Sequence, residues 1–136
     1  MALVYPVLAQ ILLTFVMLFA TGGARFKALK SKRVRMSQIA VSSEAWPEDV
    51  RKFSNNYANQ FETPVLFYAL AGVAIFIRAT DIVMVTLAWL FVVTRVLHAV
   101  VHTGGNDVPT RFRIFLAGVA VLIIMWALIV LRLLFP

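Results

Sequence analysis

The sequence has no cysteine and little charge. Of its 136 residues only 14% are charged, whereas 62% are hydrophobic. The absence of cysteine excludes a disulfide framework, a thiolate metal site and a cysteine nucleophile. With so few charged residues, a soluble domain of this size could not build the polar exterior that its high surface-to-volume ratio demands. The composition therefore predicts an integral membrane protein.

Four apolar segments run through the chain: Leu3–Ala24, Pro64–Ile77, Ile82–Val101 and Ile114–Phe135. A transmembrane helix needs about 20 residues, so the second segment spans only if its helix begins in the polar run before it. We predict one helix from Pro47 to Ile77, kinked at Pro64. The expected fold is an all-α four-transmembrane-helix bundle, a single domain over 1–136, with spans near 3–24, 55–78, 82–102 and 113–135. No basic residue precedes the first span, so we expect it to belong to the mature protein.

Local signals mark the ends of these helices. Trp46-Pro47-Glu48-Asp49 has proline and acids where a helix begins. Asp81 is expected to cap the third span, and the run from Gly104 to Asp107 to end it. Pro109 suits the first turn of the fourth. The connections are therefore expected to be short, except for a basic loop over residues 25–46.

The net charge of +7 is concentrated beside the membrane. The first connection carries Arg25, Lys27, Lys30, Lys32, Arg33, Arg35, Arg51 and Lys52, and the third carries Arg111 and Arg113. Cytoplasmic loops are enriched in such residues, so both termini are expected outside the cytoplasm. This placement favours anionic lipid over nucleic acid as the partner of the basic segment. The lean connections, without organelle signals, indicate a bacterial inner membrane.

Polar residues inside the predicted spans form two sets. Asn55, Asn59 and Glu62 are spaced i, i+4, i+7 on the second span. Arg95, His98 and His102 are spaced i, i+3, i+7 on the third. Each set shares a helix face, and the two helices run antiparallel. We therefore expect Asn55 near His102, Asn59 near His98 and Glu62 facing Arg95, within one subunit or across a subunit boundary.

These residues have several interpretations. Ionisable groups within a span mark functional sites, but a buried Glu–Arg pair can also fix helix register. His98 and His102 with Glu62 could hold a metal, although no further ligand or HExxH pattern supports this, and we predict no metal site. Gln10, Thr14 and Thr21 are expected to line a helix contact. Trp46, Trp89 and Trp126 are expected to be lipid-facing or interfacial anchors.

The motifs on these two spans resemble those of the MAPEG family, the membrane-associated proteins of eicosanoid and glutathione metabolism. Asn59-Gln60-Phe61-Glu62-Thr63-Pro64 is similar to the family's Asn-x-x-Glu followed closely by proline. Arg95-Val96-Leu97-His98 is similar to its Arg-x-x-His/Tyr. Two positions depart from the family's common pattern, which has tyrosine at His102 and arginine at Asn55.

The resemblance implies a homotrimer whose sites lie between subunits and take glutathione as co-substrate. Asn59 and Glu62 would then hold the amino end of glutathione, with Arg95, His98, Asn55 and His102 around the tripeptide. Arg111 or Arg113 would stabilise its thiolate, because a thiol of pKa about 8.5 ionises at neutral pH only beside positive charge. The implied activity is that of a glutathione transferase or peroxidase acting on lipophilic electrophiles or lipid hydroperoxides.

Two other functions remain open from the sequence. One is a non-catalytic protein of the same fold that binds a lipophilic ligand or acts as a scaffold, its polar residues serving trimer assembly. The other is a small transporter, which would need a continuous polar route across the bilayer. The outer halves of the spans, including Val65–Ile77 and Ile82–Leu90, are nearly all apolar and disfavour such a route.

Overall fold

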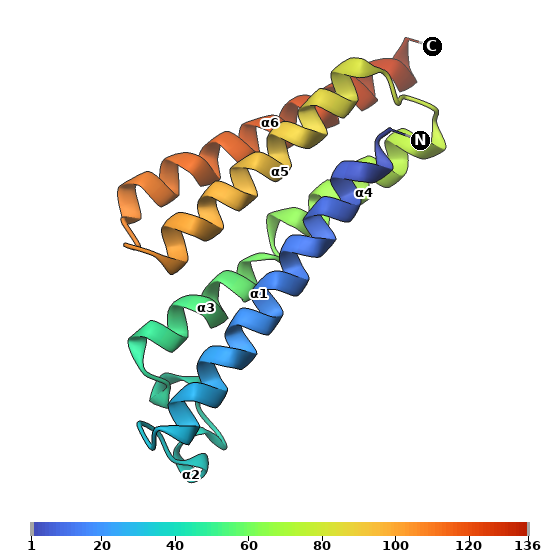
Figure 1. Ribbon diagram of the computed structural model, residues 1–136. Coiled ribbons are helices and arrows are strands. Elements are labelled where there is room, and N and C mark those ends of the chain that lie inside the picture. The colour runs from blue at the N-terminus through green and yellow to red at the C-terminus, as the bar shows by residue number, and fades with distance from the viewer. Residues whose placement is uncertain (1, 136) are drawn as a thin grey trace.

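The computed structural model describes residues 2–135 and is helical over most of that range (Figure 1). Three helices, α1 (Val4–Lys30), α5 (Ile82–Thr103) and α6 (Val108–Leu134), are long and apolar enough to cross a membrane. A fourth crossing is built from α3 (Glu48–Asn59) followed by α4 (Thr63–Phe76). The short helix α2 (Met36–Ile39) and the 3-10 helix η1 (Ser43–Ala45) lie in the connection before α3.

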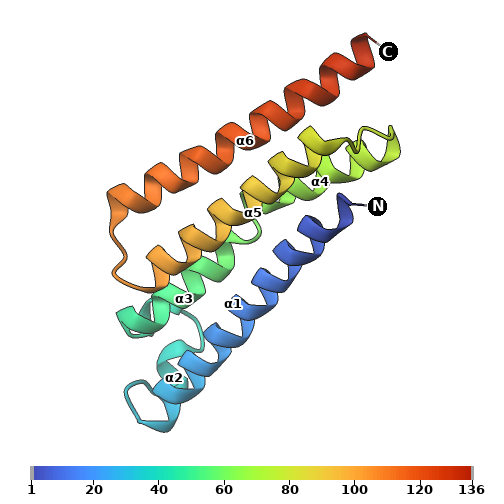
Figure 2. The same ribbon diagram turned by 45° about the horizontal axis from the view of Figure 1, so that its top comes forward.

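The four crossings lie side by side and alternate in direction. Figures 1 and 2 show both termini and the α4–α5 turn at one end, with the α1–α3 connection and the α5–α6 loop at the other. Arg132 near the end of α6 forms an ion pair with Asp81 in the α4–α5 turn. At the opposite end, Lys52 Nζ donates to the carbonyl oxygen of Gly104 over 3.2 Å. The basic connections therefore share one end of the bundle.

The second crossing is broken where a single kinked helix was predicted. α3 ends at Asn59 and α4 begins at Thr63, with residues 60–62 between them. Pro64 lies in the first turn of α4, where its missing N–H costs nothing, and a proline also disfavours helical geometry in the residue before it. The proline therefore begins a new helix, and the expectation of one continuous helix was wrong.

The predicted boundaries of α5 and the start of α6 agree with the structure, whereas α1 continues to Lys30, six residues beyond the predicted end of the first span. The Asp81 carboxylate accepts hydrogen bonds from the backbone N–H groups of Val83 and Met84, at 3.0 and 3.1 Å. At the start of α6, Asp107 accepts from the N–H of Thr110 at 3.0 Å, and Pro109 occupies the first turn. Each cap satisfies backbone donors that have no partner within the helix itself.

The apolar core joins α4, α5 and α6. Phe67 of α4 stacks on Phe91 of α5 with ring centroids 4.7 Å apart, and both side chains are fully buried. Further buried residues of this core are Leu3, Ala71, Ala74, Ala79, Met84, Ala88, Val92, Leu122, Met125 and Ile129. Between α5 and α6 the contact is close at Gly118, where an added Cβ would lie 2.8 Å from the Thr94 hydroxyl. Small residues at membrane-helix contacts allow this close approach.

We expect Gly118→Ala to lower the thermal stability of the detergent-solubilised protein, because overpacking costs about 1–3 kcal/mol. Gly72→Ala is the matched control, since a Cβ there meets nothing within 4 Å. Alanine should be neutral or up to about 1 kcal/mol stabilising at that helical position. Adding Thr94→Ala to Gly118→Ala should restore stability. Equal melting temperatures for the Gly118 and Gly72 variants would contradict a tight α5–α6 contact.

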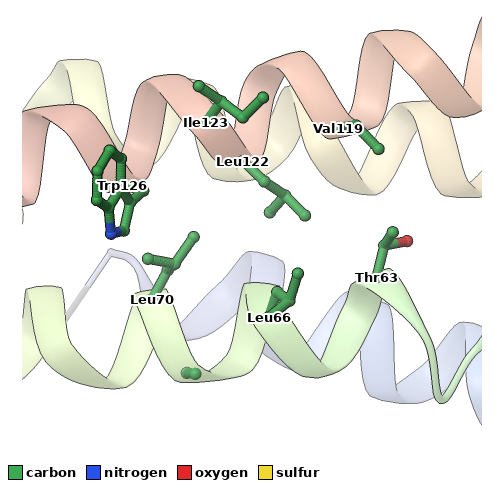
Figure 3. Close-up of a pocket in the computed structure, with 8 residues that line it drawn as sticks. Thr63, Leu66, Leu70, Val119, Leu122, Ile123 and Trp126 are labelled. Carbon is green, nitrogen blue, oxygen red and sulfur yellow. The ribbon is translucent and has the colours of Figure 1, made fainter.

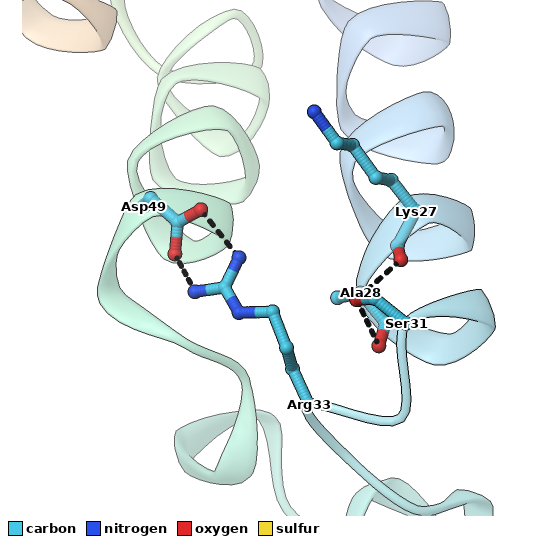
Figure 4. A network of polar contacts seen from close by, with 5 residues as sticks. All are labelled: Lys27, Ala28, Ser31, Arg33 and Asp49. Atoms are coloured by element: carbon cyan, nitrogen blue, oxygen red, sulfur yellow. Dashed lines mark hydrogen bonds and ion pairs between the residues drawn. The ribbon is translucent and has the colours of Figure 1, made fainter.

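The basic connection folds against the ends of α1 and α3. Arg33 makes a two-pronged ion pair with Asp49, at 2.7 and 2.9 Å, and the Ser31 hydroxyl donates to the carbonyl oxygen of Lys27 (Figure 4). The hydrogen bonds and charge of Arg33 lower the pKa of the Asp49 carboxyl. Because the folded-state pKa is lowered, this contribution to stability is present at neutral pH and is lost as the pH falls through that pKa.

Trp46 corrects one sequence-based expectation. It is only 8% exposed and packs with Ala28, Val34 and Val50 in a second apolar cluster. The Arg25 guanidinium lies over its ring at 5.3 Å, a cation–π arrangement. Trp46 therefore anchors the connection to α1 and α3, whereas Trp89 and Trp126 are exposed, as expected for lipid-facing residues.

Candidate functional site

The three polar residues of α5 share one buried face, as their spacing predicts. Arg95, His98 and His102 are between 2% and 4% exposed. The two imidazole rings meet edge to face with centroids 5.6 Å apart. Buried polar groups of this kind need hydrogen-bond partners, and α3 provides them for Arg95 and His102.

The partner of His102 is not the asparagine that the sequence indicated. The side-chain nitrogens of Asn56 and Asn59 both lie against His102 Nδ1, at 3.3 and 3.4 Å. Asn55 is exposed on another face of α3, because successive residues turn by about 100° around a helix. Asn56 is therefore a residue that the i, i+4, i+7 pattern missed, and it is fully buried.

Glu62 and Arg95 do not form an ion pair within the part of the chain that is described. Arg95 Nη2 instead donates to the backbone carbonyl oxygen of Asn59 over 3.2 Å. Asn59 is the last residue of α3, and Glu62, beyond the helix break, is exposed. The break takes Glu62 off the face it would have had on a continuous helix. A Glu62–Arg95 contact across a subunit boundary stays a prediction.

Asn59 and His98 line a cavity of about 200 Å³ together with Arg111. Its other walls are Val108, Phe112 and Phe115 of α6. Arg111 Nη1 is oriented by a 2.6 Å hydrogen bond to the side-chain oxygen of Asn106. Arg113 is exposed and does not line this cavity. The geometry thus distinguishes two arginines that the sequence left equivalent.

Two buried atoms on the polar face of α5 have no hydrogen-bond partner within the described chain. They are Arg95 Nε and His98 Nδ1. A guanidinium N–H can only donate, whereas an imidazole nitrogen donates or accepts according to its tautomer. Unpartnered buried polar atoms are uncommon in folded proteins. The site therefore offers a donor at Arg95 and a second polar atom at His98.

A second polar cavity, of about 350 Å³, lies where α1, η1 and α3 meet. It is lined by Arg25, Ser43, Glu44, Arg51, Ser54, Asn55 and Ala58. Arg25 Nη2 donates to the Ser54 hydroxyl over 3.2 Å, while the buried Arg25 Nε has no partner in the described chain. Asn55 belongs to this cavity. Arg25 and Arg51 were assigned to the loop charge by the sequence. Arg51 lies one helical turn before Asn55 on α3, whereas Arg25 reaches this cavity from α1 through tertiary packing.

An apolar groove of about 270 Å³ lies between α4 and α6 (Figure 3). It is lined by Thr63, Leu66, Ala69, Leu70, Val119, Leu122, Ile123 and Trp126. Phe115 lines the polar cavity and Val119 lines the groove, and these two residues are four positions apart on α6. The cavity and the groove therefore share one face of α6. On the second crossing, Asn59 lines the polar cavity and Thr63, beyond the helix break, lines the groove. A polar cavity and an apolar groove thus follow one another along α6.

Over residues 2–135, no cluster of three or more His, Asp or Glu side chains is placed to hold a metal ion. The arrangement of His98, His102 and Glu62 in one chain therefore gives no metal centre of the kind considered from the sequence. The chemistry available at the cavity is that of guanidinium, amide and imidazole groups.

Comparison with known proteins gives one match. The model of the MAPEG family matches residues 3–131, which is nearly the whole chain. No curated protein and no solved structure matches. The match includes the Asn59–Glu62 and Arg95–His98 motifs and all four crossings. The chain therefore belongs to the MAPEG family and has its four-helix membrane fold.

Proposed function

We propose that this protein is a glutathione-dependent transferase or peroxidase acting on lipophilic electrophiles or lipid hydroperoxides in the membrane. One observation carries the proposal: Arg111 lines the same cavity as Asn59 and His98, which belong to the two family motifs. Many members of the family use glutathione. The cavity is near the basic end of the bundle, where a water-soluble tripeptide can enter.

The proposed chemistry needs no nucleophile from the protein. Arg111 would stabilise the glutathione thiolate, because positive charge lowers the pKa of a nearby thiol. The thiolate would attack an electrophilic carbon, forming a carbon–sulfur bond while the leaving group departs with the electron pair. With a hydroperoxide it would attack the O–O bond, giving an alcohol and a sulfenic acid that a second glutathione converts to disulfide and water. The protein supplies charge and orientation.

The outward face of α3 supports assembly into a homotrimer. Asn55 on α3 and Glu62 just beyond the end of α3 are exposed on the single chain, and both lie within the predicted span 55–78. Exposed charge at this depth is costly unless protein covers it. We propose that a neighbouring copy covers this face. The cavity around Arg25 and Asn55 of one subunit and the Arg111 cavity of the next would then share one glutathione.

The α4–α6 groove suits the apolar part of a co-substrate. All its lining side chains except Thr63 are hydrophobic, and it follows the Arg111 cavity along α6. A molecule with a reactive group near one end and a hydrocarbon tail would place the group beside the thiolate and the tail in the groove. Because the tail would leave lipid and not water, its binding depends on how well it packs in the groove.

Filling the groove is therefore expected to select against long tails. We expect Ala69→Phe to lower kcat/KM for a long-chain electrophile about tenfold, which corresponds to a steric cost of about 1.4 kcal/mol. A short aryl halide should be affected much less. Ala120→Phe is the matched control, because Ala120 is an exposed alanine of α6 outside the groove. Equal loss for short and long substrates would place the tail elsewhere.

The test of the function is product formation by the purified protein in lipid nanodiscs. Glutathione conjugates of an aryl halide and alcohols from a lipid hydroperoxide would be measured by mass spectrometry. Formation of neither product would favour the alternative, a non-catalytic member of the fold that binds a lipophilic ligand or acts as a scaffold. One observation supports that alternative: many buried polar groups of α1, α3 and α5 already pair with one another.

We also propose that the basic end faces the cytoplasm of a bacterial inner membrane, with both termini outside. The chain contains no cysteine. Single cysteines introduced at Lys30 or at Phe135 can therefore be labelled without background. An impermeant maleimide should label Phe135→Cys in intact spheroplasts and Lys30→Cys only after lysis. The reverse pattern would invert the proposed orientation.

A further inference from the structure

A buried row of side-chain amides crosses three helices beside the proposed site. Gln10 of α1, Gln60 at the end of α3 and Asn56 of α3 are each at most 1% exposed. Gln10 Nε2 donates to Gln60 Oε1 over 3.0 Å, and Gln60 Nε2 donates to Asn56 Oδ1 over 3.0 Å. Asn56 Nδ2 then meets His102 Nδ1 at 3.3 Å. The row ends on an imidazole of the polar face of α5.

The direction of this row is fixed by one backbone group. Gln60 Nε2 also donates to the main-chain carbonyl oxygen of Asn56, over 3.2 Å. A carbonyl oxygen can only accept, so the Gln60 amide cannot be turned around without losing this bond. Gln60 must therefore present its NH₂ group to Asn56, and Asn56 must present its oxygen to Gln60. The Asn56 NH₂ group is left facing His102.

The consequence for His102 follows from the two amide donors. An NH₂ group only donates, so Nδ1 must accept, and the ring proton of neutral His102 resides on Nε2. Asn59 Nδ2 shares the same acceptor at 3.4 Å. If Nδ1 carried a proton instead, it would face the NH₂ group of Asn56 without an acceptor. The amide row therefore selects one histidine tautomer.

The tautomer in turn orients Asn59, which lines the Arg111 cavity. With its NH₂ group turned to His102, Asn59 keeps its side-chain oxygen as the free end of the amide. We propose that Gln60 and Asn56 are positioning residues that fix Asn59 as a hydrogen-bond acceptor, so that the cavity takes an ammonium or N–H donor there and disfavours an oxyanion. The proposed function enters this inference only through the identity of the ligand, because the amino group of glutathione is such a donor.

Gln10 has a different part in the row, which provides a matched control. It donates to Gln60, but it does not set the direction of Gln60, which the Asn56 carbonyl already fixes. Replacing Gln10 with methionine removes a buried amide of similar size and should leave the His102 tautomer unchanged. Replacing Gln60 with methionine removes the directing group. Asn56 can then turn, and both tautomers of His102 should become populated.

The experiment is ¹⁵N NMR of histidine-labelled protein in nanodiscs, comparing wild type with Gln60→Met and Gln10→Met. His102→Gln assigns the signals. Wild type and Gln10→Met should show His102 protonated at Nε2 alone, while Gln60→Met should show a second tautomer. A wild-type Nδ1–H signal, or an unchanged single tautomer in Gln60→Met, would overturn the proposal.

Glutathione affinity is a second measurement, and it distinguishes an orienting role of Gln60 from a purely structural one. Glutathione should bind Gln60→Met about three- to tenfold more weakly, the effect of one hydrogen bond. Glutathione lacking its amino group should bind wild type and Gln60→Met equally. An equal loss for both ligands would contradict the orienting role. If glutathione binds no variant while the NMR result holds, the proposed function fails and the orientation of Asn59 stands.

Discussion

Arg111→Gln is expected to abolish the thiolate absorbance of bound glutathione and to lower kcat/KM about 100-fold. Removing one group that stabilises developing or resident negative charge typically has an effect on this scale. Arg111 lines the cavity with Asn59 and His98 and is oriented by the Asn106 side chain. Glutamine keeps hydrogen-bonding capacity but removes the positive charge. The readouts are ultraviolet difference spectra and steady-state rates.

Arg113→Gln is the control for that result, because Arg113 is two residues away and carries the same charge. Residues two apart on a helix point about 200° from one another, and Arg113 is exposed outside the cavity. Its substitution should change kcat/KM by no more than about twofold, as for most surface positions. If Arg113→Gln lost the thiolate signal and Arg111→Gln kept it, Arg113 would be the activating residue and the assignment to Arg111 would be wrong.

Arg95→Leu is expected to weaken glutathione binding about ten- to a hundredfold without dissociating the proposed trimer. Arg95 is 2% exposed, and its Nη2 holds the backbone carbonyl of Asn59, so its loss releases the end of α3. Hydrogen bonds to charged groups contribute about 1.5–3 kcal/mol, which corresponds to this range. Calorimetry measures the binding, and light scattering after size-exclusion chromatography measures the assembly.

Glu62→Gln distinguishes two roles of Glu62, which are binding of the ligand and stabilisation of the contact between subunits. If Glu62 binds glutathione, its substitution should weaken binding and leave the assembly intact. If Glu62 and Arg95 instead pair across a subunit boundary and hold the trimer together, Glu62→Gln and Arg95→Leu should each dissociate in detergent. Intact trimers with unchanged binding in both variants would contradict each role.

Local sequence signals predicted the ends of most helices correctly. Asp81 and Asp107 cap α5 and α6 because a carboxylate immediately before an apolar helix satisfies free backbone N–H groups, and this requires no tertiary information. The family motifs indicated the second and third crossings, and the structure brings Asn59 and Arg95 of these two crossings into contact. The break after Asn59 was not predicted. Pro64 is compatible with either a kink or the first turn of a new helix, and the sequence does not decide between them.

The sequence also could not predict the rotation of α3 about its own axis. The sequence placed Asn55, Asn59 and Glu62 on one face of a continuous helix, whereas α3 ends at Asn59 and both Asn55 and Glu62 are exposed. Asn56, one residue after Asn55, reaches His102 in its place. The amide row depends on Gln10 and Gln60, which are separated by 50 positions. Such contacts arise only when α1 and α3 pack together.

Glutathione binding to the wild-type protein tests the central claim most directly. Calorimetric titration of the protein in nanodiscs, with thiolate absorbance followed in parallel, should show saturable binding of at most one glutathione per subunit and a thiolate signal that rises with occupancy. Absence of binding at millimolar glutathione would contradict the account, and would mean that this fold has kept the cavity around Asn59, His98 and Arg111 for another ligand.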